Sequence, residues 1–192
     1  MSRAFVALGA NLGDRASTLD RAIAALDGLP STRVIRRARI IETDALLPPG
    51  DPTPQPRYLN TVVELDTGLE PAALLAELKA VETRLGRTPA ARWAPRVIDL
   101  DLLLWGDRVE PAGGAPPSTP LGLNAERGAP PSTPLGGLTL PHPSLHLRRF
   151  VLEPLAELAP DLVHPVLGKT IAALLAEIDV QSDPAAMIRR GP

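Results

Sequence analysis

Two aspartates, Asp99 and Asp101, stand two residues apart in the stretch Arg92–Trp105 (RWAPRVIDLDLLLW), which otherwise has the composition of a buried strand. Residues i and i+2 of a strand point to the same face, so both carboxylates are expected on one face. The alternation predicts that Ile98, Leu100, Leu102 and Leu104 pack on one face and that Val97, Asp99, Asp101, Leu103 and Trp105 lie on the other.

Two neighbouring carboxylates on a half-buried face are costly unless a positive group satisfies them. Mg²⁺ takes oxygen ligands and commonly uses one or two carboxylates plus substrate phosphates, and two metal ions could share such a pair. The alternative is an edge strand whose aspartates form surface salt bridges with the upstream Arg92 and Arg96. For the D-x-D spacing alone, the salt-bridge interpretation is the simpler one.

The whole chain has the composition of one globular domain. It has 192 residues, 44% of them hydrophobic, a net charge of −2 and no cysteine. The near-balanced charge argues against general nucleic-acid or polybasic membrane binding, and the lack of cysteine excludes thiolate chemistry and thiolate zinc sites. The N-terminus has no signal-peptide pattern and no apolar run is long enough to span a bilayer. We expect a cytoplasmic monomer with small-molecule partners.

Hydrophobic periodicity predicts an α+β chain that positions the acidic strand last in a β-α-β-β-α-β order. The expected elements are a strand at Ala4–Ala10, a helix at Arg15–Leu29, strands at Thr32–Glu42 and Tyr58–Leu65, a helix at Pro71–Leu85, and the acidic strand. This order is typical of a ferredoxin-like sandwich, which carries its helices on one face of the sheet. The other face is expected to be open, with the aspartates on it. The proline-rich loop Thr43–Arg57 is long enough to be functional.

The C-terminal part predicts a helical extension after an unusual insert. Residues 114–122 and 128–136 are both GAPPSTPLG, so residues 111–137 are interpreted as a flexible Pro/Gly-rich insert. Leu138–Leu140 is expected to pair with Arg108–Glu110. Helices are expected at Ser144–Ala159, with Ser144 as N-cap, and at Thr170–Ile178. Residues 1–180 are expected to form one catalytic domain and residues 181–192 a disordered tail.

Three further motifs give weak signals. The turn Gly9–Asp14 between strand and helix could hold phosphate on backbone N–H groups, but it is neither G-x-G-x-x-G nor a P-loop, so a tight connection is favoured. Gly168-Lys169-Thr170 resembles the end of a Walker A motif, but Val163 stands where its first glycine is required. His142 and His146 are four apart; one functional and one incidental histidine are favoured over a zinc pair.

In combination, the motifs resemble a known family. Arg92–Leu103 is similar to the signature of 6-hydroxymethyl-7,8-dihydropterin pyrophosphokinases of folate biosynthesis. The resemblance continues through most of the chain, at Val6–Asp14 (G-[AS]-N-x-G turn), Tyr58–Asn60 (Y/F-L-N), Glu82–Arg87 (E-x-x-x-G-R), Leu138–His142 (L-x-x-PH) and Arg148–Pro154 (R-x-F-x-x-x-P). Jointly these motifs are highly specific.

The resemblance implies a ferredoxin-like enzyme that transfers diphosphate from ATP to the pterin hydroxymethyl group and releases AMP. It implies that Asp99 and Asp101 hold two Mg²⁺ ions that bridge the ATP phosphates, and that Arg87 and Arg96 are catalytic and approach the transferring group as a loop closes. It further implies nucleotide contacts from Glu82, Arg87, Arg96, Leu102, Thr139, His142 and Arg148, and pterin contacts from Thr43, Tyr58, Asn60, Trp93 and Phe150.

The chain departs from the family pattern at Gly137, where an arginine is frequent, and at Pro143, where an aromatic is frequent. Two other functions stay open at the level of sequence. A Mg²⁺-dependent nucleotidyltransferase on the same scaffold would release pyrophosphate instead of AMP. A small-molecule-binding regulatory domain would bind without Mg²⁺ and would not need D-x-D flanked by arginines.

Overall fold

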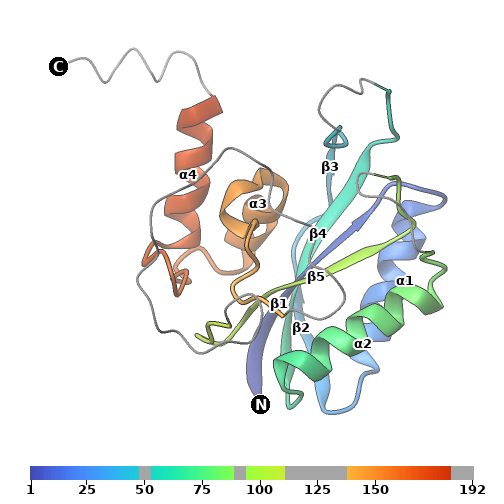
Figure 1. The fold of residues 1–192 in the computed structure, drawn as a ribbon, viewed down its shortest axis with the longest axis horizontal. Helices are drawn as coiled ribbons and strands as arrows, with labels where there is room; N and C mark the ends of the chain where they lie inside the picture. Colours follow the sequence, from blue (N-terminus) through green and yellow to red (C-terminus); the bar gives the residue numbers. More distant parts are fainter. Residues whose placement is uncertain (48–52, 89–93, 111–137, 183–192) are drawn as a thin grey trace.

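The computed structural model describes residues 1–47, 53–88, 94–110 and 138–182. This part of the chain forms an antiparallel sheet with helices on both faces (Figure 1). The elements in chain order are β1 (Ser2–Ala10), α1 (Arg15–Asp27), β2 (Thr32–Arg37), β3 (Ile41–Thr43), β4 (Tyr58–Thr67), α2 (Pro71–Arg84), β5 (Asp99–Trp105), a 3₁₀ turn η1 (Leu145–Leu147), α3 (Arg149–Leu158) and α4 (Ile171–Ser182). The predicted mixed α/β organisation is confirmed.

The sheet order is β2-β4-β1-β5, and β3 pairs with β4. In this order β1 lies in the interior of the sheet and β5 at one edge. Every pairing is antiparallel. The apolar run of β1 explains its central place, because both of its faces are buried. The acidic strand therefore keeps one long side free of strand pairing within the described part of the chain, and loops can approach the aspartates from that side.

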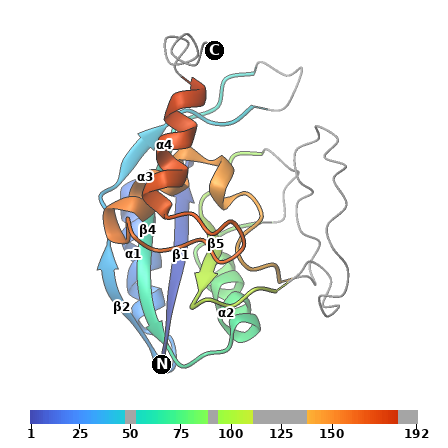
Figure 2. The same cartoon turned by 90° about the vertical axis from the view of Figure 1, so that its left-hand side faces the viewer.

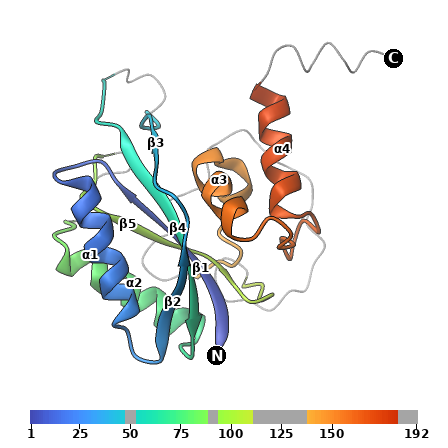
Figure 3. The same cartoon turned by 180° about the vertical axis from the view of Figure 1, so that it is seen from behind.

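Helices α1 and α2 cover one face of the sheet, as predicted (Figure 3). Their apolar sides pack on alternate residues of the strands, so that Leu19 and Leu78 are fully buried against Val6 and Leu100. α2 begins with Pro71, a favourable residue in the first turn, and ends before Gly86, whose φ of 92° suits glycine. Arg87, which follows Gly86, is thereby turned back toward the sheet.

The other face is not fully open, which corrects the prediction. α3 and α4 lie in front of this face (Figure 2), where Val151, Leu155 and Ile171 bury Phe5 and Val62 of the sheet. The C-terminal helices were expected but could not be placed from sequence. Their strongly apolar sides require a partner surface, and the second face of the sheet provides it.

The predicted strand Thr32–Glu42 is instead two strands, β2 and β3, separated at Ala38–Ile40. Ala38 is buried there; its N–H donates to Val62 O at 2.9 Å and its carbonyl accepts from Thr61 Oγ1 at 2.9 Å. The Thr61 hydroxyl thus replaces a ladder hydrogen bond, and β3 restarts as a short strand beside the beginning of β4.

The predicted helix Ser144–Ala159 is also interrupted, giving η1 and α3 with an extended residue, Arg148, between them. Ser144 precedes η1 without capping it through its side chain. The carbonyl of Arg148 accepts hydrogen bonds from Val151 N and Leu152 N, both at 3.0 Å, so the helix starts again at this point.

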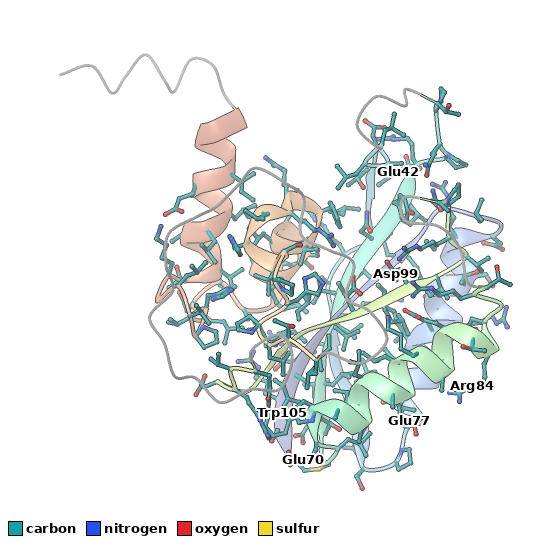
Figure 4. The ribbon with its side chains drawn as sticks, in the orientation of Figure 1. Glu42, Glu70, Glu77, Arg84, Asp99 and Trp105 are labelled. Atoms are coloured by element: carbon teal, nitrogen blue, oxygen red, sulfur yellow. The ribbon has the colours of Figure 1, made fainter. Side chains whose placement is uncertain are left out.

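A bulge changes the predicted alternation of β5. Phe5 pairs with Leu104 whereas Val6 pairs with Leu102, so Leu103 is an extra residue. After the bulge, Leu104 packs on the α3 side and Trp105 on the helix α1/α2 side, where its Nε1 donates to Leu69 O at 3.1 Å. This corrects the predicted faces of Leu104 and Trp105. Figure 4 shows Asp99 and Trp105 at opposite ends of the strand.

Glu110 and Leu140 form an isolated antiparallel bridge, as predicted for these two segments. The insert that they flank, residues 111–137, lies outside the described residues, as do Trp93 and the tail from 183 onward. No helix in the described ranges is long and apolar enough to cross a membrane.

Candidate functional site

The acidic pair lies on the α3 side of the sheet, in register with the ends of the two neighbouring strands. Asp99 is opposite Gly9 of β1, and Asp101 is opposite Ala7. Gly9 is in turn opposite Asn60 of β4. A Cβ at Gly9 would lie 2.9 Å from Asn60 Oδ1, so glycine leaves the sheet surface between Asn60 and Asp99 free of a side chain. The predicted common face of the two carboxylates is confirmed.

Two arginines from the loop between α2 and β5 bond to Asp99. Arg87 Nη1 lies 2.7 Å from Oδ1, and Arg96 Nη1 lies 2.8 Å from Oδ2. Only about a quarter of each of these three side chains is exposed, so the cluster is not an ordinary surface salt bridge. Arg92, the other arginine considered from sequence, lies outside the described residues.

Without a bound ligand, the ionised form of Asp99 is unfavourable in this cluster. Burial and the nearby Asp101 raise the pKa of Asp99 from 3.8 to about 6, although Arg96 and Arg87 act in the opposite direction. Burial alone would lower the pKa of Arg87, but Asp99 and Glu82 raise it. A further cation beside the two carboxylates would therefore stabilise the ionised form of Asp99.

Glu82 supports this cluster from α2. Its side chain is 3% exposed and accepts from Leu100 N at 2.7 Å, from Lys79 Nζ at 2.8 Å and from Arg87. It thereby joins α2 to β5 and fixes Arg87 near Asp99. All three donors bond to the same oxygen, Oε1, and the nucleotide contact predicted for Glu82 stays a prediction.

Lys79 is a site residue that the sequence interpretation missed. Its Nζ also donates to Leu100 O at 2.9 Å. Its positive charge lowers the pKa values of both Asp99 and His142, although it is the weakest of the charges that act on each. The available signal was its position three residues before Glu82, which places both on one side of the helix. Lys79 is a third cation beside the acidic pair.

His142 is held against β5 by its backbone. Its N–H donates to Leu103 O at 2.9 Å, and its Nδ1 accepts from Ser144 N at 3.2 Å. The neutral ring must then carry its proton on Nε2. Burial lowers the pKa of His142; Asp101 acts to raise it and Arg148 to lower it further. His142 therefore lies within electrostatic range of both Asp101 and Arg148.

The remaining predicted nucleotide residues differ in exposure. Thr139 is partly exposed and immediately precedes the bridge residue Leu140. The Leu102 side chain is 4% exposed in the core under α2, so only its backbone is available to a nucleotide. His146 lies beside His164 instead of His142, with ring centroids 6.0 Å apart.

Three of the predicted pterin residues, Thr43, Tyr58 and Asn60, lie at the end of the sheet near Asp99. Asn60 Nδ2 donates to Thr43 Oγ1 at 2.8 Å, which brings together two residues that were predicted to contact the same ring edge. Burial raises the pKa of Tyr58, while Arg96 lowers it and Asp99 raises it, so Tyr58 lies within electrostatic range of the acidic cluster. Phe150 is half-buried on α3, with the Arg148 guanidinium 5.8 Å from its ring centroid. The stacking of a ring between Tyr58 and Phe150 stays a prediction.

No group of three or more His, Asp or Glu side chains that could hold a metal occurs in the described ranges. The protein can therefore offer Mg²⁺ the two carboxylates of Asp99 and Asp101, and a bound substrate would have to supply further oxygen ligands. This donor set fits a metal that is bound together with nucleotide phosphates, and fits a protein-only structural site poorly.

Solved structures with a similar fold have sequences that differ strongly from this chain. The chain superimposes with a TM-score of 0.62 on an HPPK-DHPS in complex with substrates, at 14% identity, covering 94% of the chain and 44% of that structure. It superimposes with a TM-score of 0.64 on a triple mutant of Plasmodium falciparum HPPK-DHPS, at 15% identity, covering 92% and 44%. The chain thus spans less than half of these structures, and the likeness concerns the fold alone.

Curated relatives are similar over nearly their whole length. The chain is 39% identical over 179 residues to the 2-amino-4-hydroxy-6-hydroxymethyldihydropteridine pyrophosphokinase of Methylorubrum extorquens, covering 93% of the chain and 95% of the relative. It is 37% identical over 176 residues to the enzyme of the same name from Pseudomonas aeruginosa, covering 92% and 91%. The model of the family 7,8-dihydro-6-hydroxymethylpterin-pyrophosphokinase (HPPK) matches residues 5–160. The chain belongs to this family.

Proposed function

We propose that the protein transfers diphosphate from ATP to the hydroxymethyl group of 6-hydroxymethyl-7,8-dihydropterin and releases AMP, a reaction of folate biosynthesis. The observation that carries the proposal is the position of Asp99, beside Asp101 and bonded to both Arg87 and Arg96, in a chain of the HPPK family. The site combines carboxylates for metal with cations for phosphate, which is the requirement of phosphoryl-type transfer.

Asp99 and Asp101 would hold two Mg²⁺ ions together with the ATP phosphates. The raised pKa of Asp99 supports this, because a group that is costly to ionise alone gains most from a bound cation. Bound Mg²⁺ would neutralise phosphate charge and orient the β- and γ-phosphates. The protein would supply two carboxylates on one face of β5, and the nucleotide would supply the remaining oxygen ligands.

Arg87 and Arg96 would stabilise the negative charge of the transferring group. Charge-assisted hydrogen bonds from guanidinium to phosphate are strong and directional. Arg87 Nη1 bonds to both Glu82 and Asp99, so Arg87 would exchange Asp99 for phosphate as the loop closes, while Glu82 keeps it near the site. His142 would donate from Nε2 to a phosphate oxygen, with Arg148 beside it and Lys79 as an additional cation.

The pterin would lie over Gly9, between Asn60 and the acidic pair. Asn60 and Thr43 offer an amide and a hydroxyl to the polar edge of the heterocycle. Tyr58 and Phe150 would stack on its faces, and Trp93 would close over it. With the ring in this place, the hydroxymethyl oxygen would face the β-phosphorus in line with the bond to the α-phosphate. The leaving group is then AMP.

The wider organisation follows from the same proposal. We assign the antiparallel sheet with α1 and α2 to the ferredoxin-like class, with α3 and α4 as an extension on its second face. We assign residues 1–180 to one catalytic domain that acts as a cytoplasmic monomer, with residues 111–137 as a Pro/Gly-rich insert.

The test is to incubate the purified protein with ATP, Mg²⁺ and the reduced pterin and to identify all products. We expect AMP and a diphosphorylated pterin in equal amounts, and neither without pterin. ADP with a monophosphorylated pterin would show an ordinary kinase, and pyrophosphate would show a nucleotidyltransferase; either result overturns the proposal. Omission of Mg²⁺ should abolish product formation.

A further inference from the structure

Asn11 is a buried polar residue at the end of β1 that connects two loops. It is 1% exposed. Its side-chain Oδ1 accepts from Arg96 N at 2.7 Å, and its own N–H donates to Arg96 O at 3.1 Å. Its Nδ2 donates to Pro56 O at 3.2 Å. A single side chain thus bonds the loop between α2 and β5 and the loop between β3 and β4.

Both loops lead directly to proposed site residues. The Arg96 guanidinium bonds to Asp99, so the two hydrogen bonds from Asn11 hold the main chain from which this guanidinium extends. Pro56 precedes Tyr58 by two residues in the segment that enters β4. The charge of Arg96 in turn affects the pKa of Tyr58, so the two loop ends lie close together.

The hydrogen bonds at position 11 require a side-chain amide group. One branch must accept from an N–H group and the other must donate to a carbonyl, and only Asn among side chains of this length provides both. Aspartate keeps the acceptor for Arg96 but loses the donor for Pro56. Alanine loses both and leaves the Arg96 N–H and the Pro56 carbonyl without these partners.

We propose that Asn11 is a positioning residue that sets Arg96, on the phosphate side of the site, relative to Tyr58, on the pterin side. The turn Gly9–Asp14 then serves the site through this amide and not by binding phosphate. The inference rests on the proposed function for its kinetic consequences, but its structural core concerns hydrogen bonds that can be measured without substrate.

The kinetic test compares Asn11→Ala, Asn11→Asp, Arg96→Ala and the double variant Asn11→Ala/Arg96→Ala. Misplacement of a catalytic group by about 1 Å can reduce the rate on the order of a hundredfold. We expect Asn11→Ala to lower kcat at least tenfold, and to lower it less than threefold further when Arg96 is already alanine. Asn11→Asp should raise the pterin KM more than it lowers kcat. Multiplicative effects in the double variant would overturn the proposal.

A matched control separates positioning from general destabilisation. Thr67 is fully buried at the far end of the same sheet, and its hydroxyl bonds to Thr32 Oγ1 at 2.7 Å. Thr67→Ala should lower the melting temperature without changing kcat or either KM. If Asn11→Ala behaves in the same way, Asn11 is a structural residue only and the proposal is wrong.

Amide hydrogen exchange followed by NMR gives the readout that does not depend on activity. The Arg96 amide should be protected in the wild type and in Asn11→Asp, and should exchange at least tenfold faster in Asn11→Ala. Unchanged Arg96 protection in Asn11→Ala would overturn the inference. If the wild type makes no AMP with pterin, the proposed function fails, and the exchange result alone decides the role of Asn11.

Discussion

Replacing Asp99 by asparagine should inactivate the protein and stabilise it at the same time. The carboxylate has a pKa of about 6 in the folded chain instead of 3.8, with burial as the main cause and Asp101 as the second. At about 1.4 kcal/mol per pKa unit, ionising Asp99 at neutral pH costs roughly 3 kcal/mol of folding free energy. The asparagine side chain would avoid this cost while keeping a similar shape and an oxygen acceptor.

Part of this gain is offset by weaker bonds to the arginines. Arg87 keeps Glu82 as a partner, but Arg96 would bond to a neutral amide in place of a carboxylate. A loss of about 1 kcal/mol is typical for such a change, which leaves a net gain of about 2 kcal/mol. For a chain of this size that corresponds to a rise in melting temperature of roughly 4–8 °C.

The pH dependence gives the sharper test. Because the folded-state pKa is raised, stability is lost as the pH increases from about 4 through about 6 in the wild type. The stability of Asp99→Asn relative to the wild type should therefore rise by roughly 3 kcal/mol between pH 3.5 and pH 7.5 in the absence of Mg²⁺, so that the variant melts higher at pH 7.5. Asp107→Asn is the control, because that side chain is exposed in the turn after β5.

Addition of Mg²⁺ and ATP should reverse the order of stability. Ligands that bind only the folded state stabilise it in proportion to their affinity, and the variant lacks one of the two proposed metal ligands. Turnover should fall at least about a hundredfold, because metal ions supply several kcal/mol of charge stabilisation. The reasoning fails if Asp99→Asn melts below the wild type at pH 7.5 without Mg²⁺, or if Mg²⁺ with ATP stabilises both proteins equally.

Four further substitutions test other parts of the site and of the fold. Arg87→Ala and Arg96→Ala should each lower kcat more than they raise the ATP KM, because charge develops in the transition state; an effect on KM alone in steady-state kinetics would make that arginine a binding group. Burial lowers the pKa of His164, so the wild type should lose stability as the pH falls below 6.5, and His164→Asn should reduce that slope by up to about 1.4 kcal/mol per pH unit in urea unfolding. Asparagine is chosen because its oxygen can accept from the two backbone N–H groups that donate to His164 Nδ1. An unchanged slope would refute this. Gly9→Ala should weaken pterin binding at least tenfold in calorimetry with little change in ATP affinity, since the new methyl group would displace Asn60.

The sequence predicted those parts of the site that depend on local spacing. Asp99 and Asp101 share a face because strand geometry requires it, and Arg96 lies three residues from Asp99, within direct reach. Glycine after α2 turned the chain so that Arg87 could return to Asp99. The resemblance added Asn60 and Thr43, which do contact one another.

The residues that were missed act through the main chain of distant segments. Asn11 bonds to the backbone of Arg96 and Pro56, and Lys79 to the carbonyl of Leu100. Hydrogen bonds of this type leave no periodicity and no charge pattern, because any residue can provide a backbone group. They become visible only when the register of the sheet is known.

The second face of the sheet has an acidic half and an apolar half. This division could not be predicted from the sequence, because it depends on tertiary packing. Along β5, Asp99 and Asp101 come before the bulge at Leu103, and the apolar Leu103 and Leu104 come at and after it. α3 and α4 bury this apolar half together with Phe5, so the acidic half lies directly at the edge of a packed core. His142 is attached at this boundary through Leu103 O, within electrostatic range of Asp101. Burial raises the pKa of Asp99, while Arg87 and Arg96, which bond to its carboxylate, act to lower it. Burial at the edge of this packed core therefore makes the Asp99 carboxylate costly to ionise alone, and we expect a site of that kind to bind a cation together with nucleotide.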